Sequence, residues 1–508
     1  MMRLSRRSML RATGGVVAGA LLAGAVSGAT TGCGRREDSD SGDRLFAELD
    51  AKIQDLMDRH GVPGVAVGVW HDGVEHLRGF GVTNVDDPEP VTPDTLFRIG
   101  STTKTFTGTT VMRLVEAGRI DLDERVRTYL PDFTTADPTV AERVTVRQLL
   151  NHTPGWHGDY FVDTGSGEDA LAKYVAAIAT LPQQTPLGTT FAYNNAAIAL
   201  AGRIIEAVTG TGYERVVRTE LLEPLGLQHT GFSVDNLEGP PVAEPHTMAD
   251  GAPRFDRSAW YMPRCLNPTG GLISTARDQL RYARFHLGDG GGLPDLGLLS
   301  EESLTAMRSD PGPGGTLAVE IDGMGVTWHL RPSAEGVHIV QHGGAWSGQH
   351  SGFYLVPDRD FAMTVLTNSD GGAMLVADLM YTDWALDHFA GLHNLPAPVR
   401  DLSPAELADY EGRYHAYETG VDGSVDATDT VLTADRGRLR YQMLSDDGAP
   451  VTDPPPGTPA YLAFYRDDYV LQLDRDGEPL PSRADFVRDD TGQVRWLRIG
   501  GRLHRKTA

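Results

Sequence analysis

Ser101-Thr102-Thr103-Lys104 is the stretch of this chain that says most about its fold and its chemistry. Only four of the 45 basic residues are lysines, and Lys104 is one of them. Arginine stays protonated in proteins, whereas a lysine amine can lose its proton when burial or neighbours lower its pKa. Residues three apart share one face of a helix, so Ser101 and Lys104 can meet. The stretch predicts a nucleophile beside a titratable amine, although one such pair also arises by chance.

The bulk composition limits the class of protein. The chain has 508 residues, enough for two or three domains, and its 40% hydrophobic and 22% charged residues are typical of a soluble globular protein. Its net charge of −24 argues against nucleic acid as a partner, because phosphate binding needs clustered lysine and arginine. No further apolar stretch after the N-terminal one reaches the length of a transmembrane helix.

Residues 1–33 have the composition of an export signal. Four arginines between positions 3 and 11 precede an apolar run over 14–29, which is short for a membrane span. Ser5-Arg6-Arg7-Ser8-Met9-Leu10 resembles a twin-arginine signal, which a translocase reads as an address. We therefore expect the protein to be exported.

The chain has two cysteines, Cys33 and Cys265. Thr30-Thr31-Gly32-Cys33 resembles a lipoprotein cleavage site at which the cysteine becomes acylated, although Thr30 stands where such sites usually carry leucine. In that case the chain would contact the membrane only through a lipid anchor at Cys33, and Cys265 would remain a single buried thiol. Two alternatives stay open: cleavage after Ser27-Gly28-Ala29, and a disulfide between the two cysteines.

Residues 45–392 are predicted to form an α+β domain whose sheet joins both ends of the segment. The predicted strands cover 65–70 and 75–82 near its start, and 337–340, 352–356 and 361–367 near its end. The predicted helices cover 45–59, 101–117, 196–208 and, as one long helix, 373–390.

The segments around this domain differ from it in composition. Residues 34–44 are rich in Asp and Ser and are expected to be a disordered tether. Residues 393–398 include two prolines and are predicted to be a linker. Residues 399–508 contain short alternating strands separated by Asp-Gly turns, which predicts a small antiparallel β domain, either a barrel or a sandwich.

Two further motifs accompany the first. Tyr193-Asn194-Asn195 precedes an apolar helix, and Gln341-His342-Gly343-Gly344-Ala345 follows a predicted edge strand. Ser101-x-x-Lys104, Tyr193-x-Asn195 and His342-x-Gly344, in this order, resemble the serine β-lactamase and penicillin-binding-protein superfamily, and its class C branch above all. The resemblance extends over residues 45–390. It implies an antiparallel sheet flanked by helices, together with an all-helical lobe.

The resemblance also implies roles for individual residues. Ser101 would be the nucleophile, and Lys104 and Tyr193 would handle its proton, with the choice of acylation base left open. Asn195 would hydrogen-bond Lys104 and the substrate amide. The backbone N–H groups of Ser101 and Ala345 would form an oxyanion hole.

The third motif departs from the pattern of β-lactamases, which carry lysine where this chain has His342. A histidine with an ordinary pKa is mostly neutral at pH 7 and would bind a substrate carboxylate more weakly than lysine does. His342 and Gly344 are still assigned to substrate binding. The departure favours esterase, amidase or D-amino-acid peptidase chemistry over efficient β-lactam hydrolysis.

The function implied is that of an exported serine hydrolase acting through a Ser101 acyl-enzyme on an ester, amide or D-amino-acid peptide, as an esterase, D-aminopeptidase or D,D-carboxypeptidase does. The expected substrate is a small molecule or short peptide, which includes cell-wall peptides. Two alternatives are a β-lactamase proper and a penicillin or peptidoglycan sensor without turnover. No cofactor is expected, and no metal, because the sequence has no H-E-x-x-H motif.

Four other residues lie near the motifs. His152 fits a structural role in a loop, by capping or hydrogen bonding. Trp156, Tyr160 and Trp346 fit either plain packing or the lining of a substrate cleft.

Overall fold

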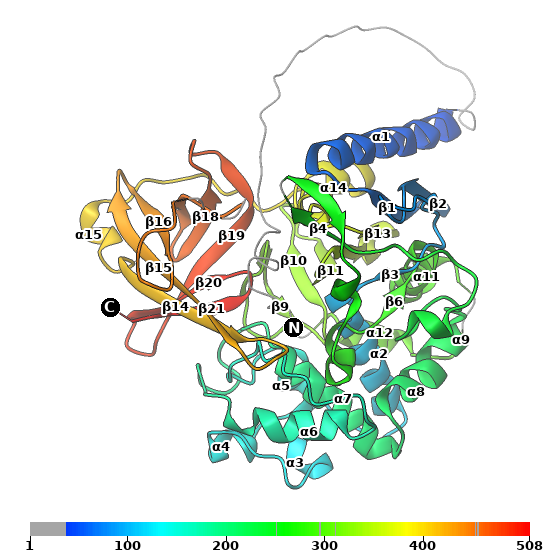
Figure 1. Ribbon diagram of the computed structural model, residues 1–508, viewed down its shortest axis with the longest axis horizontal. Coiled ribbons are helices and arrows are strands. Elements are labelled where there is room, and N and C mark those ends of the chain that lie inside the picture. Colours follow the sequence, from blue (N-terminus) through cyan, green and yellow to red (C-terminus); the bar gives the residue numbers. More distant parts are fainter. Residues whose placement is uncertain are drawn as a thin grey trace, which may run out of the picture.

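Seven antiparallel strands form the central sheet of the first domain in the computed structural model, which describes residues 37–249, 251–293, 296–309, 311–452, 454 and 457–507 (Figure 1). Their order across the sheet is β2-β1-β13-β12-β11-β10-β9. The strands are β1 (Gly64–His71), β2 (Val74–Gly81), β9 (Gly323–Met324), β10 (His329–Pro332), β11 (His338–Trp346), β12 (Gln349–Val356) and β13 (Phe361–Thr367). β1 pairs with β13, so both ends of the domain share one sheet, as the sequence predicts.

Helices cover both faces of this sheet. Helices α1 (Glu37–His60), α13 (Gly372–Met380) and α14 (Trp384–Ala390) pack on one face, and α11 (Ala276–Leu287) packs on the other. The apolar run of β1 follows from this arrangement, because side chains on both faces of the strand are buried.

A helical lobe lies beside the sheet and includes α3 to α8 in Figure 1. The helices of the lobe and its surroundings are α2 (Thr103–Glu116), α3 (Val126–Tyr129), α4 (Pro138–Ala141), α5 (Val146–Leu150), α6 (Ala170–Ala177), α7 (Asn195–Thr209), α8 (Tyr213–Val217), α9 (Glu223–Leu225), α10 (Asn267–Gly270) and α12 (Glu301–Ala306). Three short two-stranded sheets join β3 (Phe97–Arg98) to β6 (Ile273–Ser274), β4 (His246–Ala249) to β5 (Ala252–Phe255), and β7 (Gly315–Thr316) to β8 (Glu320–Ile321).

The C-terminal domain is a closed barrel of eight antiparallel strands, which decides between the barrel and the sandwich. Its elements are α15 (Pro404–Leu407), β14 (Gly412–Thr419), β15 (Val425–Asp435), β16 (Arg438–Leu444), β17 (Tyr461–Arg466), β18 (Tyr469–Leu473), β19 (Pro479–Arg488), β20 (Val494–Ile499) and β21 (Arg502–Lys506). Pairing of β14 with β21 closes the barrel. Buried side chains such as Tyr414, Phe464 and Phe486 fill its core.

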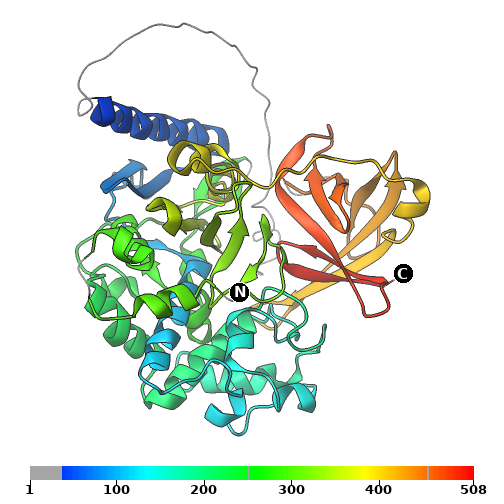
Figure 2. The same cartoon turned by 180° about the vertical axis from the view of Figure 1, so that it is seen from behind.

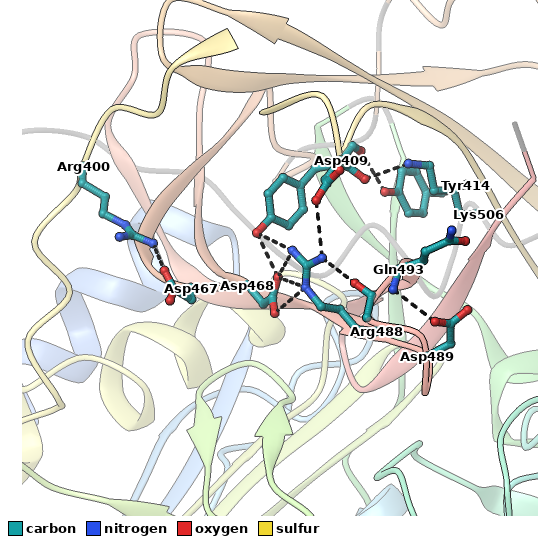
Figure 3. Close-up of polar contacts among 11 residues, drawn as sticks. Arg400, Asp409, Tyr414, Asp467, Asp468, Arg488, Asp489, Gln493 and Lys506 are labelled. Carbon is teal, nitrogen blue, oxygen red and sulfur yellow. Dashed lines mark hydrogen bonds and ion pairs between the residues drawn. The ribbon is translucent and has the colours of Figure 1, made fainter. Parts of the chain in front are cut away.

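Arg488 holds together several segments of the barrel (Figure 3). Its guanidinium donates to Asp468 at 3.0 Å, to the backbone carbonyl of Gly492 at 2.8 Å and to the Tyr410 hydroxyl at 3.0 Å. The Tyr410 hydroxyl in turn donates to Asp468 at 2.9 Å. This network ties the segment before β14 to the turn between β17 and β18, to the end of β19 and to the turn that follows β19.

Two sequence expectations about helices are wrong. The tether expected over 34–44 overlaps helix α1, which begins at Glu37 and in which Arg44 pairs with Glu48 one turn later at 2.9 Å. The single helix expected over 373–390 is broken between α13 and α14. At the break, the buried Arg331 guanidinium donates to the carbonyl groups of Met380 and Tyr381 in place of helical N–H groups.

The third motif lies within a strand and not after an edge strand, which also corrects the sequence expectation. β11 continues through the motif, and β10 and β9 extend the sheet beyond it. The predicted export signal and Cys33 lie outside the described residues. Cys265 is a free, buried thiol. Among the described residues, no helix combines the length and apolar character that a membrane crossing requires.

Candidate active site

Ser101 lies in a 3₁₀ turn, Gly100–Thr102, that leads from β3 directly into α2. Gly100 has a φ of +50°, and a Cβ there would lie 2.7 Å from the backbone nitrogen of Ala345. Glycine is therefore needed at this position, because it accepts the left-handed conformation and lets β11 approach the turn. The Ser351 hydroxyl donates to the carbonyl of Ile99 at 2.8 Å and fastens the turn to β12.

Lys104 lies one helical turn after Ser101 and is fully buried. Its Nζ is 3.0 Å from Ser101 Oγ and donates to the carbonyl of Thr269 at 2.7 Å. Burial lowers the pKa of the Lys104 amine well below its usual value; the positive charge of Arg502 adds to this, and Asp159 acts in the opposite sense. The structure thus brings the predicted pair together and favours a neutral amine.

Tyr193 packs against the amine, with its ring centroid 5.0 Å from Lys104 Nζ. Its backbone N–H donates to the carbonyl of Gly501 in the barrel at 2.8 Å. Burial raises the pKa of the Tyr193 phenol above its usual value, while the Arg502 charge and a hydrogen bond with Ser101 act in the opposite sense. The phenol is therefore protonated at neutral pH.

Asn195 begins α7, and Asn194 caps that helix by accepting from the backbone N–H of Ala197 at 2.8 Å. The Asn195 side chain donates to Asp159 at 2.8 Å. The expected hydrogen bond from Asn195 to Lys104 is replaced by this one, because Thr269 supplies an acceptor to the amine.

His152 has the structural role that the sequence suggested. Its Nδ1 accepts from the backbone N–H of Asn194 at 2.7 Å, and its ring stacks on Tyr193 with centroids 4.7 Å apart. Trp156 is buried in the core and is not part of a cleft lining.

The ring of His342 lies next to the ring of Tyr193, and His342 is only 2% exposed. Its ring stacks on His329 from β10 at 4.4 Å, and both rings lie 6.2 Å from the Tyr193 ring. Burial, with the neighbouring His329 and Lys104, lowers the pKa of His342 well below its usual value. Burial also lowers the pKa of His329 to about 3. The pair is neutral at pH 7, and His342 has little surface to offer a substrate.

Gly344 and Ala345 place β11 against the nucleophile. A Cβ on Gly344 would lie 1.9 Å from the carbonyl oxygen of Ile99 and 2.8 Å from the backbone nitrogen of Ser101. Only glycine allows this approach. Ala345 is exposed, and its backbone nitrogen adjoins the turn that carries Ser101. The two backbone N–H groups predicted as an oxyanion hole therefore belong to adjacent segments.

Arg502 and Asp159 complete the site and were missed in the sequence. Arg502 Nε donates to Asp159 at 3.0 Å, and the guanidinium carbon lies 4.5 Å from the Tyr193 ring centroid. Burial raises the pKa of the Asp159 carboxyl, but the charge and hydrogen bond of Arg502 outweigh it, so the pKa is lowered. Arg502 opens the last barrel strand, 343 positions from Asp159, and no motif marks either residue. The Gly500-Gly501 turn before it was the only local signal.

The barrel holds the segments that carry these groups. Figures 1 and 2 show the β14–β15 hairpin reaching the helical lobe. There the backbone N–H of Thr419 donates to Asp159 O at 2.9 Å, and the N–H of Phe161 donates to Thr419 O at 2.8 Å. Arg498 of β20 donates to the carbonyl of Phe191, two residues before Tyr193. The site is thus built by both domains.

A serine beside a buried lysine and a tyrosine, with the backbone of β11 against the turn that carries the serine, on a mixed helix and sheet domain, defines the class of penicillin-recognising active-site serine proteins. The family model described as Beta-lactamase matches residues 49–385, and the chain belongs to this family. Within the part of the chain that the structure describes, no group of three or more His, Cys, Asp or Glu side chains is arranged to hold a metal ion.

Individual relatives agree with this assignment. The chain is 35% identical over 372 residues to "Penicillin-binding protein 4" of Amycolatopsis lactamdurans, covering 72% of this chain and 97% of the relative. It is 24% identical to "Unguisins hydrolase ungD" of Aspergillus violaceofuscus (strain CBS 115571), covering 80% and 81%. The crystal structure of SurE covers 92% of this chain and all of its own, with a TM-score of 0.69 and 26% identity; SurE with D-Leu gives 0.67 and 28%.

Proposed function

We propose that this protein is a serine hydrolase that forms an acyl-enzyme on Ser101 and acts on an ester, amide or D-amino-acid peptide. The observation that carries the proposal is the 3.0 Å distance between Lys104 Nζ and Ser101 Oγ, in surroundings that lower the pKa of the amine. A neutral amine at hydrogen-bond distance can take the proton of an attacking hydroxyl.

The proposed reaction uses the groups in a fixed order. Ser101 Oγ attacks the substrate carbonyl carbon while the Lys104 amine accepts the hydroxyl proton. The backbone N–H groups of Ser101 and Ala345 hold the resulting oxyanion. The proton then passes to the leaving group by way of the protonated Tyr193 phenol, and the carbon–leaving-group bond breaks. Water attacks the acyl-enzyme with the same base and releases the acid and Ser101. Lys104 is therefore the proposed base, and Tyr193 the proposed relay.

The same geometry supports a role for the third motif other than substrate binding. His342 is neutral and nearly inaccessible, so we propose that its ring positions the ring of Tyr193. Arg502 supplies the nearby positive charge, and it is already paired with Asp159. A β-lactamase-like cation at the third motif is therefore lacking, which favours ester and peptide substrates over β-lactams.

The SurE structure with D-Leu supports a substrate that contains a D residue. One relative is called a hydrolase of unguisins, and another a penicillin-binding protein. The test compares nitrocefin, p-nitrophenyl butyrate and D-Ala p-nitroanilide as substrates of the purified protein. We expect ester or D-aminoacyl turnover well above β-lactam turnover, and loss of turnover in Ser101→Ala. The reverse ranking would favour a β-lactamase, and an acylation burst without turnover would favour a sensor.

We also propose that the protein is exported and that Cys33 anchors it to the outer face of the cytoplasmic membrane. The support is the twin-arginine pattern and the cleavage-site resemblance of residues 1–33. Fractionation of cells that express the full chain should place it with membranes, and Cys33→Ala should release it into the soluble exported fraction. Retention of the Cys33→Ala variant on membranes would contradict the anchor.

A further inference from the structure

Tyr261 is the only aromatic residue among the exposed large apolar side chains of the described residues, with 53% of its surface exposed. It is nevertheless held from two sides. Its hydroxyl donates to the Asp163 carboxylate, and its backbone carbonyl accepts from the Trp346 indole N–H at 3.2 Å. The bond to Asp163 raises the pKa of Tyr261 to about 12, so the hydroxyl keeps its proton. Fixing an exposed ring costs side-chain entropy without the gain of burial.

These contacts place Tyr261 at the edge of the active site. Trp346 directly follows Ala345, whose backbone N–H belongs to the proposed oxyanion hole. Asp163 lies in the loop that also carries Asp159, and its backbone N–H donates to Val421 O of the β14–β15 hairpin at 3.0 Å. Tyr261 therefore connects the end of β11 to the loop that the barrel holds. We call Tyr261 and Trp346 the aromatic rim.

The rim differs in chemistry from the rest of the site. The groups that handle protons, Lys104 and Tyr193, are buried, and the charged Arg502 lies beside them. The accessible side chains that the contact between Tyr261 and Trp346 brings to this edge of the site are instead aromatic. Tyrosine and tryptophan offer large rigid contact areas at low entropic cost, which suits them to bind apolar groups.

We propose that the aromatic rim is the subsite for a large apolar side chain on the acyl group of the substrate. This inference rests on the proposed function, because it assumes that the acyl group is bound at Ser101. The rim packs against the side chain, while the polar interior receives the leaving group and its proton. The preferred acyl groups are then aromatic or branched aliphatic ones.

The test measures kcat/KM for p-nitrophenyl acetate and p-nitrophenyl 3-phenylpropionate, which share a leaving group. The wild-type protein should prefer the phenylpropionate ester by about tenfold or more, the size of a modest apolar pocket. The Tyr261→Ala/Trp346→Ala double variant should lose most of this preference. Tyr261→Phe keeps the ring and loses only the hydroxyl, so it should retain most of the preference and separate ring packing from the bond to Asp163.

Val74→Ala, which removes an exposed apolar side chain from the distant β1–β2 hairpin, is the matched control and should leave both esters unaffected. A double variant that loses activity toward both esters in equal proportion would show that the rim is only structural and overturn the proposal. So would a wild-type protein that shows no preference between the two acyl groups. In each of these cases the wild-type protein keeps Ser101-dependent turnover, whereas failure of the proposed function removes it.

Discussion

Replacement of Gly344 by alanine should disrupt the oxyanion hole while keeping the side chains of Ser101 and Lys104. The added Cβ would lie 1.9 Å from the carbonyl oxygen of Ile99 and 2.8 Å from the backbone nitrogen of Ser101. Backbone atoms cannot swing aside, so β11 and the turn before α2 must separate by more than about 1 Å to reach ordinary contact. That displacement moves the N–H of Ala345 away from the substrate oxygen.

The expected cost is large. Misplacing a catalytic group by about 1 Å costs about 100-fold, and loss of one oxyanion donor costs about 100- to 1,000-fold in kcat. We therefore expect Gly344→Ala to lower kcat for p-nitrophenyl butyrate by about 100-fold or more, with a smaller change in KM. The assay is the release of p-nitrophenol, with the pre-steady-state burst reporting acylation separately.

Gly212→Ala is the matched control for this variant. Gly212 has a φ of −57°, and a Cβ there would meet only a Glu214 side-chain oxygen at 3.9 Å. We expect its kinetics and its melting temperature to equal those of the wild type. A folded Gly344→Ala protein with kcat within about threefold of the wild type would refute the assignment of β11 to the oxyanion hole.

Three further changes have expected outcomes. Arg502→Gln removes the cation that helps to lower the pKa of Lys104, so this pKa should rise and the acid limb of the pH profile of kcat/KM should move to higher pH. Tyr193→Phe keeps the packed ring and removes the proposed relay, and kcat should fall by about 100-fold or more while the melting temperature changes little. Arg488→Ala breaks the network of Figure 3 and should destabilise the barrel by about 1–2 kcal/mol, measured by denaturant unfolding.

Two arginines of the C-terminal domain serve as control positions for these changes. Arg505→Gln removes an exposed charge from the strand that carries Arg502 and should leave the pH profile unchanged. An unshifted acid limb in Arg502→Gln, or wild-type kcat in Tyr193→Phe, would contradict the proposed roles. Arg400 pairs with the exposed Asp467, and Arg400→Ala should cost less than about 1 kcal/mol. Equal losses of unfolding free energy in Arg488→Ala and Arg400→Ala would contradict the prediction that the Arg488 network stabilises the barrel more than the exposed Arg400–Asp467 pair does.

The sequence predicts the parts of the site that depend on local structure. Ser101 and Lys104 share a helix face, so their spacing alone brings them together. The expected α+β domain followed by a β domain is also present. The spacing of apolar residues distinguishes strands from helices, and it can be read from the local sequence. The order of the three motifs placed Tyr193 and β11 near the serine through the family resemblance, and the structure agrees.

The features that the sequence did not predict depend on distant contacts. Alternating strands fit a barrel and a sandwich equally, and only the pairing of β14 with β21 closes the barrel. Arg331 ends α13 through hydrogen bonds from a strand 49 positions earlier. The approach of Arg502 to Asp159 requires the barrel to dock on the first domain, which no local pattern encodes.

The proposed reaction depends on the formation of an acyl-enzyme at Ser101. Incubation of the purified protein with a fluorophosphonate probe, followed by intact-mass and peptide mass spectrometry, tests it most directly. We expect a single adduct on Ser101, no adduct in Ser101→Ala, and no ester turnover in that variant. An adduct on another residue, or ester turnover that survives in Ser101→Ala, would contradict it.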